Sequence, residues 1–158
     1  MLYHKVIPLV DFGRLIETFN GIIPFYYFMS SAENKATARK FVQEVFNQGK
    51  IDEAKNFVTS GLIYHGLQEI RGLEDFKNSI LEDRTAFPDM QVTIVDDFAE
   101  QNKVAMRWTL KGTFQNEFHG IPPTNKKFET QGVEILHFEN GKIKEAWTVF
   151  DTFTPPYL

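Results

Sequence analysis

The sequence of 158 residues contains no cysteine, which excludes disulfide bonds, thiolate nucleophiles and thiolate metal ligands. It also lacks the run of roughly 20 apolar residues that a membrane-spanning helix needs. A Gly-rich phosphate loop and a nucleophile elbow are both missing. The net charge is −4, and the basic residues are scattered among acidic ones rather than gathered in a stripe. We therefore expect neither a nucleic acid nor a membrane as a partner.

The sequence is rich in aromatic residues. They make up 15% of the chain, and 16 of them are Phe, while hydrophobic residues as a whole account for 42%. This composition is typical of one globular domain with a sizeable core. It also suits a domain whose interior is lined with rings.

The first 29 residues differ from the rest of the chain. They carry apolar clusters, but Asp11, Arg14 and Glu17 interrupt any signal-like apolar core, so we expect a cytoplasmic protein. Two interpretations stay open: an apolar arm that packs on the domain or on a partner, or a non-native stretch before a true start at Met29. We therefore divide the chain into an extension, residues 1–29, and a domain, residues 30–158.

The first half of the domain has helical periodicity. Ser30 and Glu33 resemble a capping box, and the apolar stripe that follows ends at Gly49. A second, short helix is expected over 51–58 and a third over 72–87, bounded by Pro88. The third should turn four residues inward: Leu73, Phe76, Ile80 and Leu81.

The second half has the period of two that is typical of strands, from Met90 to Asp151, with a short earlier strand over 62–65. Asn140 and Gly141 indicate a tight hairpin turn. Helices followed by an antiparallel meander predict an α+β fold, in which about three helices pack on the concave side of a cone-shaped sheet. We expect a second subunit to cover the open face of this sheet and form a homodimer.

Four stretches carry a resemblance to a known family: AFPDM (86–90), VAMRWTLKGT (104–113), FHGIPPT (118–124) and FENGKIKEAWTVFD (138–151). In this order they resemble the SnoaL-like polyketide cyclases of the nuclear-transport-factor-2-like superfamily. The resemblance implies a polyketide or ester cyclase that closes a ring by intramolecular aldol condensation. It does not fix the substrate, because one fold hosts many reactions.

Asp151 is the first catalytic candidate. Strand alternation places Trp147, Val149 and Asp151 on one face, and on the concave side this carboxylate would stand in an aromatic pocket that raises its pKa. In the cyclases that the chain resembles, an Asp at this position transfers the proton. The alternative is a strand-end carboxylate that accepts backbone hydrogen bonds.

His137 and Glu134 are alternatives for a second role. A two-residue turn at Asn140-Gly141 places Glu134 opposite Trp147 on the pocket face, whereas a three-residue loop brings His137 there. The resemblance favours His137 as catalytic, because related cyclases use a His on this strand. The sequence alone leaves both registers open.

The remaining candidates surround the expected pocket. His65 follows a short strand near the rim and could be catalytic or structural. Arg107 and Thr109 share one face of a strand, and Arg107 could hold a substrate carboxyl group or form an ion pair. His119 is expected at the pocket entrance, and Trp147 on a pocket wall.

The four histidines show no metal-ligand spacing, so we expect no metal and no cofactor. The sequence therefore predicts cofactor-free acid–base catalysis on a small apolar or aromatic molecule. Two alternatives stay open: a non-catalytic binding domain of the same fold, or a related hydratase, dehydratase or isomerase.

Overall fold

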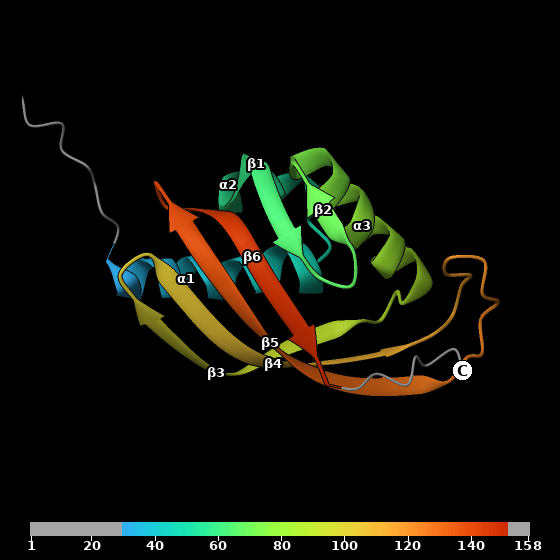
Figure 1. Cartoon of the computed structure of the whole chain (residues 1–158). Coiled ribbons are helices and arrows are strands. Elements are labelled where there is room, and N and C mark those ends of the chain that lie inside the picture. The colour runs from blue at the N-terminus through green and yellow to red at the C-terminus, as the bar shows by residue number, and fades with distance from the viewer. Residues whose placement is uncertain (1–29, 152–158) are drawn as a thin grey trace, which may run out of the picture.

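The computed structural model describes residues 30–151 and shows helices packed on the concave side of a strongly curved, six-stranded sheet (Figure 1). The helical elements are α1 (Ser31–Phe41), the π-helix η1 (Val42–Asn47), the 3₁₀-helix η2 (Ile51–Glu53), α2 (Ala54–Phe57) and α3 (Leu73–Ala86). The strands are β1 (Val58–His65), β2 (Glu69–Arg71), β3 (Gln91–Glu100), β4 (Lys103–Thr113), β5 (Lys127–Glu139) and β6 (Lys142–Phe150). The predicted α+β class is confirmed. The predicted extension, residues 1–29, lies outside the described residues.

The capping box at the start of α1 is confirmed. The Ser30 hydroxyl accepts a hydrogen bond from the Glu33 N–H at 3.2 Å, and the Glu33 carboxylate accepts one from the Ser30 N–H at 2.7 Å. The helix continues as η1 and ends before Gly49, whose φ of +67° suits a residue without a side chain. Within residues 30–151, no helix is both long and apolar enough to cross a membrane.

The second predicted helix is only partly correct. The 51–58 segment divides into η2 and α2, and β1 begins at Val58 rather than at Leu62. The third helix lies where the sequence predicts it. Its Leu81, however, is 53% exposed and not turned inward.

The strand order is β2-β1-β6-β5-β4-β3. Strands β3 to β6 form the predicted antiparallel meander. Strands β1 and β6 form a parallel pair. The chain enters β1 from α2, and β6, the last strand, lies beside β1 in the sheet. Helix α3 packs on β1 and β2, and α1 packs on β3 and β4.

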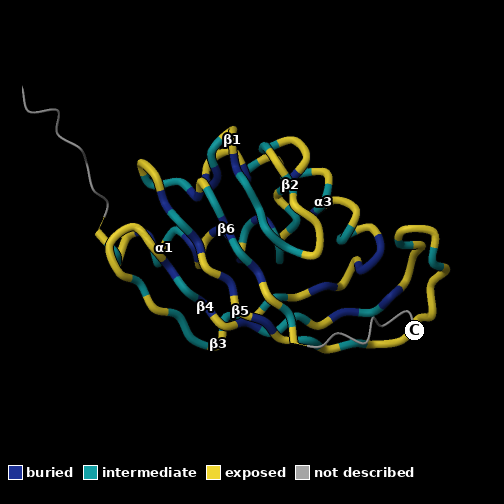
Figure 2. Tube along the Cα trace, in the orientation of Figure 1, coloured by how far each residue is buried: buried dark blue, intermediate teal, exposed yellow. Residues whose placement is uncertain are grey.

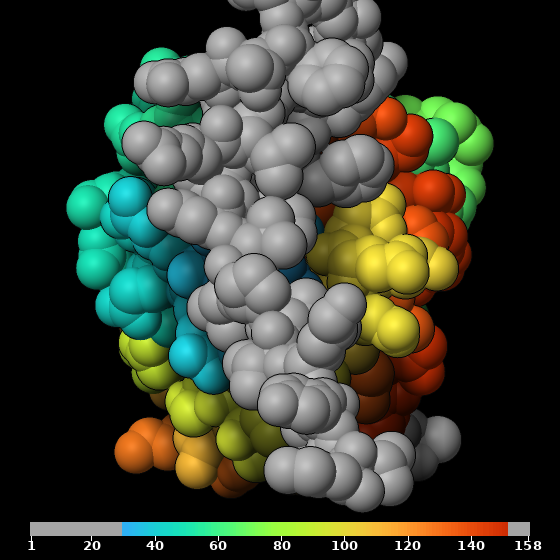
Figure 3. Space-filling view, turned by 90° about the vertical axis from the view of Figure 1, so that its left-hand side faces the viewer, coloured from blue at the N-terminus to red at the C-terminus, as the bar shows by residue number. Residues whose placement is uncertain are grey.

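Buried and exposed residues alternate along the long strands (Figure 2). The buried residues of β4 and β5 face the helices and form the core with Phe41, Phe76 and Leu62. A second apolar cluster around Phe87 and Phe114 fills the end of the cone near the 114–126 loop. In the space-filling view, helix α1 and the last strands lie on opposite sides of the molecule (Figure 3). The sheet therefore has a helix-covered concave face and an open outer face.

Candidate functional site

The concave face carries two buried polar side chains that lie opposite each other on neighbouring strands. Glu134 on β5 is paired in register with Thr148 on β6, and they are 4% and 8% exposed. Glu134 Oε1 is buried and has no hydrogen-bond partner in the described part of the chain, and the Thr148 hydroxyl beside it is buried next to the hydroxyl of Tyr64. Buried polar atoms are normally hydrogen-bonded, so this pair is a candidate site for a polar group of a ligand.

Tyr64 on β1 belongs to the same cluster. Burial raises the pKa of its hydroxyl well above the ordinary value, and the charge of Glu134 raises it further. The ring packs on Phe76 of α3, with 5.5 Å between the centroids. Tyr64 therefore remains protonated at neutral pH, and its hydroxyl can donate a hydrogen bond. The residue as a whole is half-buried.

Glu134 has the electrostatics of a proton-transfer group. Burial raises the pKa of its carboxyl from 4.5 to about 7, and the Tyr64 hydroxyl limits the rise as a hydrogen-bond donor. A carboxyl group with this pKa exists in both protonation states at neutral pH, so it can act as a base and as an acid.

Aromatic side chains surround this cluster on the concave face. Trp108 on β4 packs edge-on against Phe150 of β6, with ring centroids 5.3 Å apart. Its indole lies directly over Gly132, where a Cβ atom would come within 2.5 Å of the ring. Phe46 and Leu110 are partly buried and contact both apolar clusters. The polar cluster thus lies in an apolar environment, which accounts for the raised pKa of Glu134.

Asp83 on α3 is a second acidic residue on this side. It is half-buried, and burial raises the pKa of its carboxyl to about 7, with a smaller contribution from the neighbouring Glu82. Its charge also contributes to the raised pKa of Tyr64. Tyr64 therefore has one carboxyl from the sheet and one from the helix layer in its electrostatic environment.

A β-bulge decides which side chains of β6 face inward. The turn has two residues, Asn140 and Gly141, both with positive φ, which is one of the two turns that the sequence leaves open. The register then shifts between His137 and Phe138, because β6 has an extra residue at Lys144. Glu134 faces inward, as the two-residue turn predicts, but it pairs with Thr148 instead of the expected Trp147.

The bulge turns Trp147 to the outer face, where it lies between two histidines. His65 stacks on its indole at 5.1 Å, and His137 lies against it at 4.5 Å. His65 also contacts Glu145 at 3.0 Å and Glu69 at 3.2 Å. This placement corrects the expectation that Trp147, His65 and His137 line the interior.

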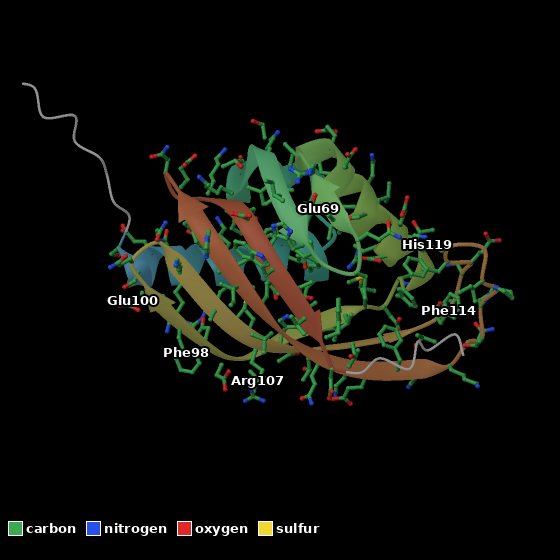
Figure 4. All side chains as sticks on the ribbon, viewed as in Figure 1. Glu69, Phe98, Glu100, Arg107, Phe114 and His119 are labelled. Carbon is green, nitrogen blue, oxygen red and sulfur yellow. The ribbon has the colours of Figure 1, made fainter. Side chains whose placement is uncertain are left out.

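Asp151, Arg107 and Thr109 are likewise not part of the buried cluster. Asp151 is exposed at the end of β6, where its carboxylate accepts a hydrogen bond from the Gln131 amide at 3.0 Å. Arg107 forms an ion pair with Asp96 at 2.7 Å, and Figure 4 shows it on the sheet side that faces away from the helices. Thr109 alternates with Trp108, which points inward, and so shares the outer face with Arg107. Arg107 thus has the ion pair, one of the two roles that the sequence leaves open. The expectation that Asp151 and Thr109 contribute to an interior pocket is corrected accordingly.

His119 lies in the 114–126 loop near the end of α3 (Figure 4). It is exposed, has a positive φ of 51°, and approaches Glu82 of α3 to 4.0 Å. The structure thus places it at the end of the cone and not beside Glu134.

Comparison with known proteins decides the family. Residues 36–155 match the SnoaL-like polyketide cyclase family, which is most of the chain. The chain belongs to this family. The resemblance found in the sequence is confirmed.

Several members of the family and its fold are similar to this chain. Aklanonic acid methyl ester cyclase AcmA from Streptomyces galilaeus is 27% identical over 118 residues, which cover 71% of this chain and 80% of AcmA. The structure of AclR from the same organism, for which a hydroxylase activity has been suggested, is 29% identical with a TM-score of 0.69, and the match covers 77% of this chain and 91% of AclR. A SnoaL-like polyketide cyclase from Agrobacterium tumefaciens has a TM-score of 0.65 at 20% identity, covering 75% of this chain and 91% of that protein, and shows the fold alone.

Three residues are absent from the sequence-based prediction: Tyr64 and Thr148 of the Glu134 cluster, and Asp83, whose charge acts on Tyr64. Asp83 could have been found, because it continues the apolar stripe of its helix at a position where a core residue is expected. Thr148 could not, since its inward direction depends on the bulge.

Proposed function

We propose that this protein closes a ring in an apolar, carbonyl-bearing substrate of the polyketide type, by acid–base catalysis at Glu134. The observation that carries this proposal is a buried carboxyl group with a pKa of about 7 and one unpartnered oxygen, opposite the buried hydroxyl of Thr148. Membership of the cyclase family and the similarity to AcmA support the reaction class.

In the first step, the ionised Glu134 takes a proton from a carbon flanked by two carbonyl groups. The electron pair of the C–H bond becomes an enolate, whose negative oxygen accepts a hydrogen bond from the Tyr64 hydroxyl. Preorganised donors of this kind stabilise the developing charge because they need no reorganisation during the reaction. The Thr148 hydroxyl, beside Glu134, helps to orient the same carbonyl group.

In the second step, the enolate carbon attacks another carbonyl carbon of the same molecule. A C–C bond forms, the π bond of the attacked carbonyl breaks, and the resulting alkoxide takes up one proton, which balances the one that Glu134 removed from carbon. The aromatic residues on the concave face favour flat, apolar substrates and limit access of water. A bound cofactor is not needed for this proton balance.

The direct test is turnover of aklanonic acid methyl ester, the compound in the name of the relative AcmA, by wild-type protein and by Glu134→Gln. Glutamine keeps the shape of the side chain but cannot take up the proton. We expect ring closure by the wild type and a loss of about 10²-fold or more in the variant. Equal rates in the two proteins would rule out Glu134 as the base.

A non-catalytic binding domain is the second candidate function. It is favoured by the unpartnered Glu134 oxygen and the neighbouring Thr148 hydroxyl, because a protonated Glu134 and this hydroxyl could hold a carbonyl group without reaction. In that case the compound binds, but its acidic hydrogen exchanges with deuterated water no faster than it does without the protein. Measuring both binding and exchange on the same sample distinguishes the two functions.

A further inference from the structure

Asp83 occupies a position where α3 otherwise carries core residues. It follows Ile80 by three positions and Phe76 by seven, and these two residues are 3% and 1% exposed. On an α-helix this spacing places all three side chains on one face. Because α3 packs on β1 and β2, that face is directed toward the concave side of the sheet.

The carboxylate of Asp83 has no structural partner. Within residues 30–151 its side chain makes neither a hydrogen bond nor an ion pair. The neighbouring Arg84 donates instead to the carbonyl oxygens of Phe46 at 2.5 Å and Asn47 at 3.4 Å. An unpaired, half-buried carboxylate disfavours folding. Stability therefore does not explain an aspartate at this position.

Asp83 shares its electrostatic environment with the proposed active site. The titratable or charged groups around it are Glu82 and Arg84 on its own helix and Tyr64 on β1, and beyond Tyr64 lies Glu134 on β5. Asp83 and Glu134 both act on Tyr64, whereas neither shifts the pKa of the other. Tyr64 therefore lies within the electrostatic influence of one carboxyl group from the sheet and one from the helix layer.

We propose that Asp83 is the general acid of the ring closure, which donates the proton to the alkoxide while Glu134 removes the proton from carbon. This inference rests on the proposed function. In the substrate, one C–H bond and one carbonyl π bond are broken, and one C–C bond and one O–H bond are formed. Glu134 ends protonated and Asp83 ionised, and exchange of one proton with water restores both.

If Glu134 removes the proton from carbon and Asp83 protonates the alkoxide, substitutions of the two residues should affect different steps. With aklanonic acid methyl ester in deuterated water, Asp83→Asn should retain exchange of the acidic C–H but slow ring closure by about 10²-fold. Glu134→Gln should lose both. Asp75→Asn is the matched control: it removes an exposed carboxylate from the first turn of the same helix and should change either rate by less than about threefold.

The pH dependence gives a second readout that a structural role would not change. The wild type needs Glu134 ionised and Asp83 protonated, so kcat/KM should pass through a maximum near pH 7. For Asp83→Asn, kcat/KM should no longer fall at alkaline pH, but it should still fall at acidic pH. Asp83→Ser serves as a second variant if Asp83→Asn does not fold.

The outcomes separate the two proposals. Ring closure by Asp83→Asn at the wild-type rate, with the alkaline decline intact, would overturn the role of Asp83 while leaving that of Glu134. Loss of C–H exchange in Asp83→Asn would also overturn it, because Asp83 would then act in the first step. A wild-type protein that neither exchanges nor cyclises the compound would overturn the proposed function, and this role with it.

Discussion

Glu134 on β5 and Thr148 on β6 face each other on the concave side of the sheet, and the buried Oε1 of Glu134 lacks a hydrogen-bond partner among residues 30–151. This pairing depends on the extra residue at Lys144, since without the bulge Trp147 would stand in the place of Thr148. One inserted residue thus places a hydroxyl, rather than an indole, beside the carboxyl group. The chemistry proposed for this protein follows from that local geometry.

The raised pKa of Glu134 predicts how stability depends on pH. The folded state favours the protonated form, so the free energy of unfolding falls as the pH rises from about 4.5 to about 7. This interval corresponds to roughly 3 kcal/mol at about 1.4 kcal/mol for each pKa unit. Glu134→Gln should therefore melt above the wild type at pH 8 and close to it at pH 4.5. Asp83 contributes in the same direction over a similar range.

Thermal denaturation across this pH range tests the prediction. Glu117→Gln, which changes an exposed glutamate of the 114–126 loop, provides the control and should follow the wild-type curve. If Glu134→Gln were less stable than the wild type at pH 8, favourable interactions would hold Glu134 in its ionised form, and its pKa would not be raised by burial.

Tyr64→Phe removes the hydroxyl that is expected to stabilise the enolate. Loss of one such donor typically lowers turnover by about 10²-fold to 10³-fold. Because the ring and its contact with Phe76 are retained, the melting temperature should change little. Steady-state kinetics with aklanonic acid methyl ester measure the effect, and an unchanged kcat would show that Tyr64 does not contact the enolate.

Gly132 permits the close approach of Trp108 to β5. A Cβ atom at this position would lie 2.5 Å from the indole and 2.6 Å from the Val149 carbonyl oxygen, which belongs to the backbone and cannot rotate away. Gly132→Ala should therefore lower the free energy of unfolding by about 1–3 kcal/mol. Urea denaturation gives this value. Gly61→Ala, where no atom lies within 4 Å of the added carbon, should cost much less.

The outer face of the sheet has a continuous apolar row. Strand registers place Phe98, Ala105, Ile135 and Trp147 side by side across β3, β4, β5 and β6. Phe98 is 70% exposed, and Figure 4 shows it projecting away from the helices. Next to this row, Arg107 is already paired with Asp96, so its charge is neutralised on the same face. We propose that a second copy of the chain covers this face.

Light scattering coupled to size-exclusion chromatography should then show a dimer at micromolar concentration. Phe98→Asp should convert it to a monomer, because a charge would be buried between the two sheets. Leu67→Asp is the control, since Leu67 is 79% exposed but lies in the turn between β1 and β2. A monomeric wild type, or a dimer that both variants retain, would argue against this interface.

The sequence predicts those parts of the fold that depend on local patterns. The Ser30 cap, the stripe on α3 and the Asn140-Gly141 turn each follow from residues a few positions apart, and all three are found in the structure. Local patterns do not predict that β1 begins at Val58, because the pairing of β1 with β6 joins residues that are far apart in the chain.

The candidate site was harder to predict for the same reason. Alternation along β6 correctly groups Trp147 with Val149, but the face on which they lie depends on the bulge at Lys144. No local residue pattern indicates that bulge. The resemblance to cyclases then directed attention to Asp151 and His137, whereas the buried carboxyl group belongs to Glu134.

The proposed chemistry requires that Glu134 change protonation state near neutral pH in an apolar environment. This is tested most directly by following the side-chain carboxyl carbon of Glu134 by NMR as the pH is varied, with Glu134→Gln to assign the signal. We expect a midpoint at about pH 7. A midpoint near 4.5, the ordinary value for glutamate, would mean a solvated carboxylate and would contradict the proposed role of Glu134 in proton transfer.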